Sequence, residues 1–509
     1  MRRAELLGFT AAALTLLGCE TIAGLGDFGP EPTPTGGAGG VGGTGVGGAG
    51  GTGVGGTGGR GGSGFDQPAA SYSRSFGSSA ADTFGGLDTG TTDVLIAGTH
   101  LGDIELDQVL VHSGGVNHFV AGLSAFLEPN WSRSFACDGN GLLGWLSVGG
   151  ARVSIVGWVT DAIGFGGTTL TPQAPSDAYW AQLNSQSGSH VNSAMAPTPN
   201  AQHAWAVAAH GGGAVAGGLY LADVDFGGLS QPLSADGKDG YVVRYRNDGV
   251  AMWAARITGT DQQEVRALAI DAASDIVYVA GIHQAEGTAG YVTTCAVPHH
   301  ATTGDNWDSF IVALDLASGS CLGVASFESA DHVVARGLAH RDDGLVFVGT
   351  FEGTVDFGAG PHESLGSDDG FVARFLPATA GAGGIGDCDW SQRYGAAGRD
   401  RAFATDVDAA GNVVVVGDFE QTVDFGAGPQ TARSKDVFVL KLDDQGEHLW
   451  SGAYGSPQDD SALRVAVDDE SNIIVGGEFS DRLTFGNEPL VSNGSTDLFV
   501  AKFPPNPTR

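Results

Sequence analysis

The sequence predicts an all-β protein built from seven similar units, each of about four antiparallel strands. Three observations support this prediction. The octapeptide TVDFGAGP occurs at Thr354–Pro361 and again at Thr422–Pro429, 68 residues later. Short apolar runs rich in Val, Ile, Phe and Tyr recur between turn residues, which is typical of strands. Fainter copies of the same phrases extend over most of the chain. Four-stranded units repeated around an axis make a β-propeller, so a seven-bladed β-propeller is the predicted fold.

The first element of the chain is an apolar stretch that follows two arginines. It runs from Leu6 to Gly18 and ends at Cys19. Since a helix needs about 20 residues to span a bilayer, this run is too short to do so, and it has the length of a signal-peptide core. Residues 1–18 are therefore predicted to be a lipoprotein signal peptide. The sequence Leu-Leu-Gly-Cys at 16–19 resembles the lipobox of bacterial lipoproteins, which implies that Cys19 is the lipid attachment residue. A plain secretory signal with a chance cysteine is the alternative.

Residues 19–70 are predicted to be the lipidated cysteine followed by a flexible tether. From Ala38 to Gly64 the chain is almost entirely Gly with Ala, Val, Thr and Ser, which cannot bury apolar surface. A match to GxGxxG at 51–56 follows no predicted strand and opens no predicted helix, so no dinucleotide site is predicted. Two or three acyl chains on one cysteine anchor a protein durably in a bilayer. The predicted location is the bacterial cell envelope, with the outer membrane or cell surface favoured over the inner membrane.

Three phrases recur in the seven repeats. The first is an apolar strand that ends in glycine, followed eight residues later by a large apolar residue in six of the seven copies. These glycines are Gly98, Gly157, Gly218, Gly281, Gly349, Gly417 and Gly477. The second phrase has an aromatic residue two positions after Asp, as in DVFVLKL. The third is a tryptophan phrase such as WSGAY, whose tryptophan is lost in repeats two and four. The octapeptide is therefore predicted to be a packing and turn device, with one copy in each blade.

The two ends of the repeat array predict that the ring is closed. The last repeat stops soon after Phe499, before any copy of the tryptophan phrase, and the missing strand occurs at the other end as Tyr72–Phe76. We therefore expect this N-terminal strand to complete the last blade. Residues 71–504 are predicted to form the propeller and residues 505–509 a C-terminal tail. An open solenoid of the same units is the alternative, and it would leave strand edges exposed.

The repeat phrases resemble those of the seven-bladed β-propeller repeat family often called SBBP, which is common on bacterial envelope proteins. The cleanest copies lie at Gly411–Val413, Asp436–Lys441 and Trp450–Gly455. The resemblance covers roughly residues 72–503, and repeats two and four depart from it most. It implies a fold and no settled activity.

An aspartate that recurs two residues before the aromatic of the second phrase is the most regular candidate for chemistry. Its copies are Asp177, Asp239, Asp308, Asp369, Asp436 and Asp497. A ring of carboxylates could collect cations, but Asp side chains also bond the backbone N–H groups of turns, and we favour this structural role. The segment Asp406–Asn412 departs from the order of a calcium loop and is predicted to be a hairpin turn. No metal site and no cofactor is predicted.

The fourth repeat carries an insertion, roughly His283–Trp307, that contains Cys295 and two adjacent histidines, His299 and His300. Their spacing matches no established zinc pattern, so an exposed loop is favoured over a zinc site. Cys295 and Cys321 flank one strand of this blade and form a possible disulfide. Cys137 and Cys388 belong to distant blades and are not expected to pair with each other.

Composition and motifs narrow the function without identifying it. The chain has 24 Lys and Arg against 58 Asp and Glu, a net charge of −34, which disfavours a nucleic-acid partner. No hydrolase elbow, metalloprotease motif or phosphate loop occurs, so the chain is predicted not to be an enzyme. We expect a tethered scaffold that binds an envelope protein or a glycan through its loops, with the fourth-repeat insertion and 376–387 as candidate contacts. The alternative is a polysaccharide hydrolase or lyase with carboxylates in the central channel.

Overall fold

The computed structural model describes residues 67–507 apart from short gaps. The gaps are residues 92, 197, 236, 259–261, 285–290, 293–294, 297–305, 342–343, 378–383 and 487. The chain divides into two units, Met1–Gly64 and Phe65–Arg509. The predicted signal peptide, Cys19 and most of the tether therefore lie outside the described residues. Within the described residues, no helix has the length and apolar character needed to cross a membrane.

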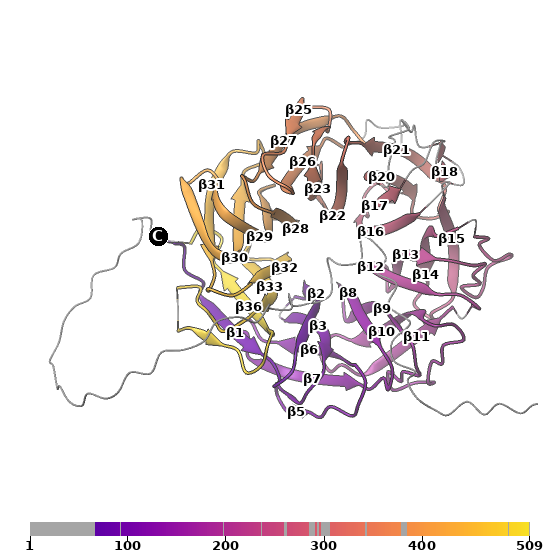
Figure 1. Ribbon diagram of the computed structural model, residues 1–509. Coiled ribbons are helices and arrows are strands. Elements are labelled where there is room, and N and C mark those ends of the chain that lie inside the picture. The colour runs from indigo at the N-terminus through magenta and orange to yellow at the C-terminus, as the bar shows by residue number, and fades with distance from the viewer. Residues whose placement is uncertain are drawn as a thin grey trace, which may run out of the picture. The chain divides into compact units, whose positions relative to one another are not determined.

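The second unit consists of seven four-stranded antiparallel sheets, the blades, arranged in a ring (Figure 1). Blade 1 contains β2 (Asp82–Thr89), β3 (Val94–His100), β6 (Asn117–Leu123) and β7 (Pro129–Phe135). Blade 2 contains β8 (Gly141–Gly149), β9 (Arg152–Val159), β10 (Asp177–Asn184) and β11 (His190–Met195). Blade 3 contains β12 (Gln202–His210), β13 (Gly213–Tyr220), β14 (Asp239–Tyr245) and β15 (Ala251–Thr258). Blade 4 contains β16 (Gln263–Asp271), β17 (Ile276–Gln284), β20 (Trp307–Asp315) and β21 (Cys321–Phe327).

The remaining three blades have the same order of strands. Blade 5 contains β22 (His332–Arg341), β23 (Gly344–Glu352), β26 (Asp369–Phe375) and β27 (Cys388–Tyr394). Blade 6 contains β28 (Asp400–Val407), β29 (Val413–Asp424), β30 (Pro429–Leu442) and β31 (His448–Tyr454). Blade 7 contains β32 (Ser461–Val467), β33 (Ile473–Phe479), β36 (Asp497–Phe503) and β1 (Tyr72–Phe76). The seven-bladed β-propeller predicted from the sequence is therefore confirmed.

Short strands also form between the main strands of several blades. They are β4 (Ile104–Glu105), β5 (Val109–Leu110), β18 (Tyr291–Val292), β19 (Cys295–Ala296), β24 (Thr354–Asp356), β25 (Pro361–Glu363), β34 (Arg482–Leu483) and β35 (Leu490–Val491). In the fourth repeat, β18 pairs with β15, so this insertion extends the sheet of the preceding blade 3. The other three pairs, β4–β5, β24–β25 and β34–β35, are hairpins between the second and third strands of their own blades.

The N-terminal strand closes the ring. β1 pairs antiparallel with β36 over five residue pairs, from Tyr72 opposite Lys502 to Phe76 opposite Leu498. The first strands of neighbouring blades also contact each other around the whole ring, and β32 of blade 7 contacts β2 of blade 1. The predicted closure by residues 72–76 is confirmed, and the open solenoid is excluded.

The glycine of the first repeat phrase is required by a bulge in the strand beside it. The first strand of each blade shifts its register by one residue opposite this glycine, as between Ala402 and Ala404 in blade 6. A Cβ atom on Gly417 would collide with the carbonyl oxygen of Arg401 and approach the ring of Phe438 to 2.8 Å. The other six glycines meet a carbonyl oxygen of the first strand in the same way. Only glycine therefore fits this position in all seven blades.

Substitution of this glycine is expected to be severely destabilising. In Gly417→Ala the added methyl group must displace backbone, and we expect the free energy of unfolding to fall by at least about 3 kcal/mol. Gly164→Ala is the control, because its Cβ would have only one neighbour within 4 Å, at 3.7 Å. Urea denaturation of both variants measures the effect. Equal stability of the two variants would contradict the explanation of the repeated glycine.

The repeated octapeptide forms a hairpin turn in both copies. In the first copy, the Asp356 carboxylate accepts hydrogen bonds from the backbone N–H groups of Gly358 and Gly360, at 2.7 and 3.1 Å. Both glycines have a positive φ, 110° and 114°. Asp424 accepts the same two bonds in the second copy, at 2.8 and 3.0 Å. The turn therefore needs Asp and both glycines, which explains why these letters recur.

The phenylalanine of the octapeptide fills the space between two blades. The ring centroid of Phe357 lies 4.5 Å from that of Phe371 in its own blade and 5.2 Å from that of Phe327 in the preceding blade. Phe485 lies 5.0 Å from both Phe499 and Tyr454 in the equivalent arrangement. One cluster between two blades therefore contains the repeated glycine, the phenylalanine of the octapeptide, the aromatic residue of the second phrase and the last residue of the tryptophan phrase. Aromatic pairs of this kind add to the energy of burial.

The tryptophan phrase forms contacts between the outer parts of adjacent blades. The indole N–H of Trp390 donates a hydrogen bond of 3.0 Å to the carbonyl oxygen of Asp444 in the next blade. The same ring packs on Gly446, which has a positive φ of 80° and no room for a Cβ. Trp131 and Trp253 make equivalent hydrogen bonds to the next blade. The octapeptide and the tryptophan phrase therefore each supply residues to a contact between neighbouring blades.

Candidate functional site

The aspartates of the second phrase lie buried in the third strand of their blades, at or next to its first residue except for Asp436, which lies within the long strand β30. Each of blades 5, 6 and 7 shows the same local hydrogen bond, in which the carboxylate accepts from a backbone N–H three or four residues earlier. These bonds are Leu365 to Asp369 (3.0 Å), Arg433 to Asp436 (3.2 Å) and Asn493 to Asp497 (2.7 Å). The six aspartates belong to six blades and bond their own surroundings. A turn role remains our proposal for them.

A second set of buried carboxylates was missed in the sequence. Asp82, Asp400 and Asp460 lie at or next to the start of the first strand of a blade, beside the aspartate of the preceding blade. Burial, strengthened by that neighbouring negative charge, raises the pKa of Asp82 to about 6 and that of Asp460 to about 7. A fixed spacing could have revealed them. Each lies five residues after the glycine that follows a tryptophan phrase or its N-terminal counterpart YSRSF.

An arginine links two blades that are not adjacent in the ring. Arg464 of blade 7 donates a hydrogen bond of 3.1 Å to the carbonyl oxygen of Gly144 in blade 2. Its guanidinium carbon lies 4.1 Å from the centroid of the Trp145 ring, a cation–π contact. Blade 1 lies between these two blades. The first strands of blades 7 and 2 are therefore linked directly as well as through blade 1.

Two carboxylates near the other ends of the first strands hold neighbouring blades together. Asp88 accepts a hydrogen bond of 2.7 Å from the backbone N–H of Val148 in the next blade, and Asp406 accepts the same bond from Val467. Burial raises the pKa of Asp88 to about 6 and that of Asp406 to about 7. The negative charge of Asp88 contributes to the raised pKa of Asp406, so the two carboxyl groups lie near each other.

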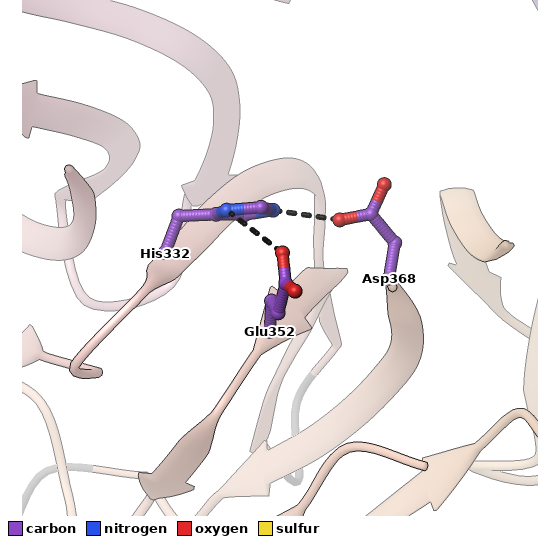
Figure 2. Close-up of side chains that lie close together, drawn as sticks. All are labelled: His332, Glu352 and Asp368. Atoms are coloured by element: carbon purple, nitrogen blue, oxygen red, sulfur yellow. Dashed lines mark hydrogen bonds and ion pairs between the residues drawn. The ribbon is translucent and has the colours of Figure 1, made fainter. Parts of the chain in front are cut away.

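A cluster on the rim of blade 5 brings together an imidazole and two carboxylates (Figure 2). His332 begins β22, Glu352 ends β23, and Asp368 immediately precedes β26. His332 and Glu352 face each other as a residue pair in the strand ladder. The imidazole Nε2 lies 2.6 Å from Asp368 Oδ1, and Nδ1 lies 3.8 Å from Glu352 Oε2. We call these three residues the rim cluster.

The imidazole and the two carboxylates of the rim cluster have complementary charges, and the three side chains are partly exposed to solvent. The side chains of His332, Glu352 and Asp368 are 31%, 42% and 16% exposed. The hydrogen bond with Asp368, helped by the charges of both carboxylates, raises the pKa of His332 above its usual value. Burial opposes ionisation of Asp368, but the hydrogen bond and charge of His332 hold its pKa below the usual range. Arg399 of blade 6 binds the other oxygen of Asp368, with Nε 3.3 Å from Oδ2.

The rim positions differ from blade to blade, in contrast to the core. The position of His332 is taken by Arg399 in blade 6 and by Asp459 in blade 7. The position of Asp368 is taken in blade 6 by Lys435, whose Nζ lies 3.6 Å from Asp459 Oδ2. The residue type at these positions varies from blade to blade, so the repeat pattern does not single out the rim cluster.

The predicted loop contacts and zinc alternative in the fourth repeat fall largely outside the described residues. His299, His300 and the side chain of Cys295 belong to this part. The hairpin predicted at Asp406–Asn412 joins β28 and β29, and the Asp408 carboxylate accepts backbone hydrogen bonds from Ala410 and Asn412. Lys441 Nζ lies 2.8 Å from the same carboxylate, so this aspartate is occupied within its own blade.

The cysteines divide into free and bonded thiols. Cys137 is buried and Cys388 half-buried, and both are free. Cys321 is disulfide-bonded, and β19, which contains Cys295, lies beside β21. Pairing of Cys295 with Cys321 remains our prediction. Peptide mapping of the unreduced chain is expected to yield a Cys295–Cys321 cross-linked peptide that disappears on reduction. Recovery of Cys295 as a free thiol would contradict it.

Comparisons with known proteins add little beyond this geometry. No family model matches the chain, and no curated protein matches it. Among solved structures, the chain is similar to BamB from Moraxella catarrhalis, with 11% identity, a TM-score of 0.35, and coverage of 83% of this chain and 86% of that one. It is also similar to the quinohemoprotein alcohol dehydrogenase ADHIIG from Pseudomonas putida HK5, with 11% identity, a TM-score of 0.38, and coverage of 87% and 76%. The quinohemoprotein alcohol dehydrogenase from Comamonas testosteroni gives 10% identity, a TM-score of 0.38, and coverage of 86% and 76%. At such identities and scores, these similarities assign no family and no activity to the chain.

Proposed function

We propose that the chain is a lipid-anchored protein of the bacterial envelope whose propeller is a non-catalytic scaffold for a protein or glycan partner. The observation that carries the proposal is the contrast between a core that repeats and a rim that does not. Repeated positions serve contacts between blades, so they cannot distinguish one partner from another. Varied side chains on a rigid frame can do so, because the frame holds loops in fixed positions.

The topology of the blades defines the proposed binding face. Since the strands of a blade are antiparallel and paired in order, the loops between second and third strands share one face with the connections between blades. We call this face the long-loop face. It carries the rim cluster, the octapeptide hairpins and the insertion of the fourth repeat. The turn between β14 and β15 lies on the opposite face.

The anchor belongs to the same proposal and rests on the sequence. The first described residue is Gln67, whose side chain donates a hydrogen bond of 2.6 Å to Gln430 and accepts one of 2.9 Å from the backbone N–H of Ala453. The residues between Cys19 and Gln67 would span roughly 40 Å as a random coil. Labelling cells with a radioactive fatty acid is expected to mark the wild type and not Cys19→Ser, which should leave the membrane fraction. Labelling of the variant would refute the assigned attachment residue.

A matched pair of charge reversals tests the binding face. Arg399→Glu changes an exposed cation on the long-loop face, and Arg246→Glu changes an exposed cation on the opposite face. Both chains are cross-linked in intact cells, and the partners are compared with those of the wild type. We expect Arg399→Glu to lose a partner that Arg246→Glu retains. Loss of the partner from Arg246→Glu alone would move the site to the other face, and a chain with no partner would overturn the scaffold role.

The channel hydrolase or lyase remains the alternative function. The specific observation in its favour is the pair Asp88 and Asp406, whose pKa values are raised by burial into the range of a general acid. It predicts that the chain cleaves a member of a panel of envelope polysaccharides and that Asp406→Asn abolishes the cleavage. A chain inert on the panel would leave the scaffold role as the better account.

A further inference from the structure

We propose that the rim cluster is a binding site for a divalent transition-metal ion such as zinc. His332, Glu352 and Asp368 come from three segments of blade 5, and their ligand atoms all lie within 4.8 Å of one another (Figure 2). The sequence predicts no metal site, because none of the three residues belongs to a motif. The site lies on the long-loop face, but the metal proposal does not depend on the proposed partner binding.

The donor set determines the class of ion. Zinc binds imidazole nitrogen at about 2.0–2.1 Å and carboxylate oxygen at about 2.0–2.2 Å, so its ligand atoms lie about 3–4 Å apart. To reach this spacing, the 2.6 Å separation of His332 Nε2 and Asp368 Oδ1 must widen slightly and the Glu352 carboxylate must move closer, for which its 42% exposed side chain has room. Imidazole favours zinc, copper or nickel over calcium and magnesium, which prefer oxygen alone. Three protein ligands leave a fourth position for water or another group.

The surroundings hold one ligand in place. Arg399 Nε binds Asp368 Oδ2, and the backbone carbonyl oxygen of Asp368 accepts a 2.8 Å hydrogen bond from the N–H of Asp400. Asp368 Oδ1 remains directed at the imidazole Nε2. Hydrogen bonds to a ligating carboxylate are typical of metal sites, because they fix its orientation. The positive charges of Arg399 and nearby Arg336 oppose a cation, and the two carboxylates of the cluster offset them.

The ion would replace the proton that His332 now shares with Asp368. Binding breaks the hydrogen bond between Nε2 and Oδ1 and releases that proton to solvent, so that both atoms become ligands. Glu352 then turns from the Nδ1 side of the ring towards the ion. The bound ion would then link the first, second and third strands of blade 5 at the rim through its three ligands. The ion is therefore expected to raise the melting temperature of the chain.

Zinc titration of the full chain in detergent, freed of metal by chelation and dialysis, tests the proposal at pH 8. A chromophoric chelator competes for zinc and reports the affinity. We expect His332→Ala and Glu352→Gln to weaken the tightest zinc site by at least about tenfold. His190→Ala is the matched control, because His190 is also half-buried but its Nε2 lies 3.1 Å from the hydroxyl of Ser193. This control should bind zinc as the wild type does.

Two further measurements make the result decisive. Glu352→Gln changes an exposed side chain, so its metal-free melting temperature should match that of the wild type and separate lost binding from misfolding. Cobalt should give a visible absorption band that zinc abolishes and excess magnesium does not. The proposal is overturned if the wild type binds no zinc, if His332→Ala binds it as tightly as the wild type, or if magnesium displaces cobalt.

Discussion

Deletion of Tyr72–Phe76 is expected to abolish the stable monomeric ring. β1 supplies the outer strand of blade 7, and without it β36 presents a free edge to solvent. Phe76 is only 4% exposed and packs with residues of blades 7 and 1, including Leu498 and Phe84. Loss of five ladder pairs and one buried aromatic is expected to cost well over about 5 kcal/mol. Exposed strand edges also recruit other chains, so we expect soluble aggregates.

Size-exclusion chromatography and thermal unfolding of the deletion variant measure this effect. Phe76→Ala should cost about 3–4 kcal/mol by itself, since it empties a buried aromatic site. Tyr72→Ser is the control at the other end of the strand, where the side chain is 40% exposed, and it should cost less than about 1 kcal/mol. A synthetic peptide covering residues 67–80 should restore the monomer by adding the missing strand. A deletion variant that stays monomeric with an unchanged melting temperature would show that the seam is dispensable.

The second large effect is a loss of stability as pH rises from 5 to 8. Burial is the main cause that raises the pKa of six carboxyl groups at or near the blade junctions. They are Asp82 and Asp88 (about 6) and Asp400, Asp406, Asp460 and Glu478 (about 7). Because the folded chain binds these protons more tightly than the unfolded chain, it is stabilised in acid and loses that advantage as pH passes through 6–7. The free energy of unfolding is expected to fall by on the order of 5 kcal/mol.

A different set of carboxylates limits stability at lower pH. Although burial opposes ionisation, hydrogen bonds and charge from Lys441 and Lys502 lower the pKa of Asp408 and Asp468. Their contribution is present above the unfolded pKa and is lost as pH falls through the lowered values. The stability maximum is therefore expected near pH 4, around the pKa values that carboxyl groups have in the unfolded chain.

Urea denaturation between pH 4 and pH 8.5 checks this prediction, and two adjacent residues provide the test and its control. Asp460→Asn removes a buried titrating group and should flatten the pH profile above pH 6. Asp459→Asn changes a carboxylate that is 60% exposed and should leave the slope unchanged. A free energy of unfolding that rises steadily from pH 5 to pH 8 would refute the assignment.

The architecture could be predicted from the sequence because packing between blades imposes the same residues seven times. Gly417 and its equivalents recur because a neighbouring carbonyl oxygen occupies the place of a Cβ, and Phe357 recurs because it fills the space between blades. Ring closure was predictable for the same reason, since Phe76 belongs to a displaced copy of a repeat phrase.

Features that occur once could not be found in this way. His332 and Glu352 are brought together only by the register of β22 and β23. Asp368 comes from the segment between the β24–β25 hairpin and β26. The insertion of the fourth repeat was located from its length, but its two-residue strands carry no periodic signal. Its pairing with β15 of the preceding blade was therefore unpredictable. Asp82, Asp400 and Asp460 do share a fixed spacing, but it occurs in only three of the seven blades, so it is a weaker signal than the three repeat phrases.

The strand that closes the ring is also the strand through which the chain leaves towards its N-terminus. Pro68 and Ala70 contact blades 6 and 7 immediately before β1 begins, through the hydroxyl of Tyr454 and the carbonyl oxygen of Phe485. Mechanical tension on the preceding residues would therefore pass first into these contacts and then into the seam itself. The other main strands of each blade follow one another along the chain, whereas β1 is joined to β36 by hydrogen bonds and side-chain packing alone. A pulling force on the N-terminal side is therefore expected to separate β1 from β36 first and to open the ring at this point.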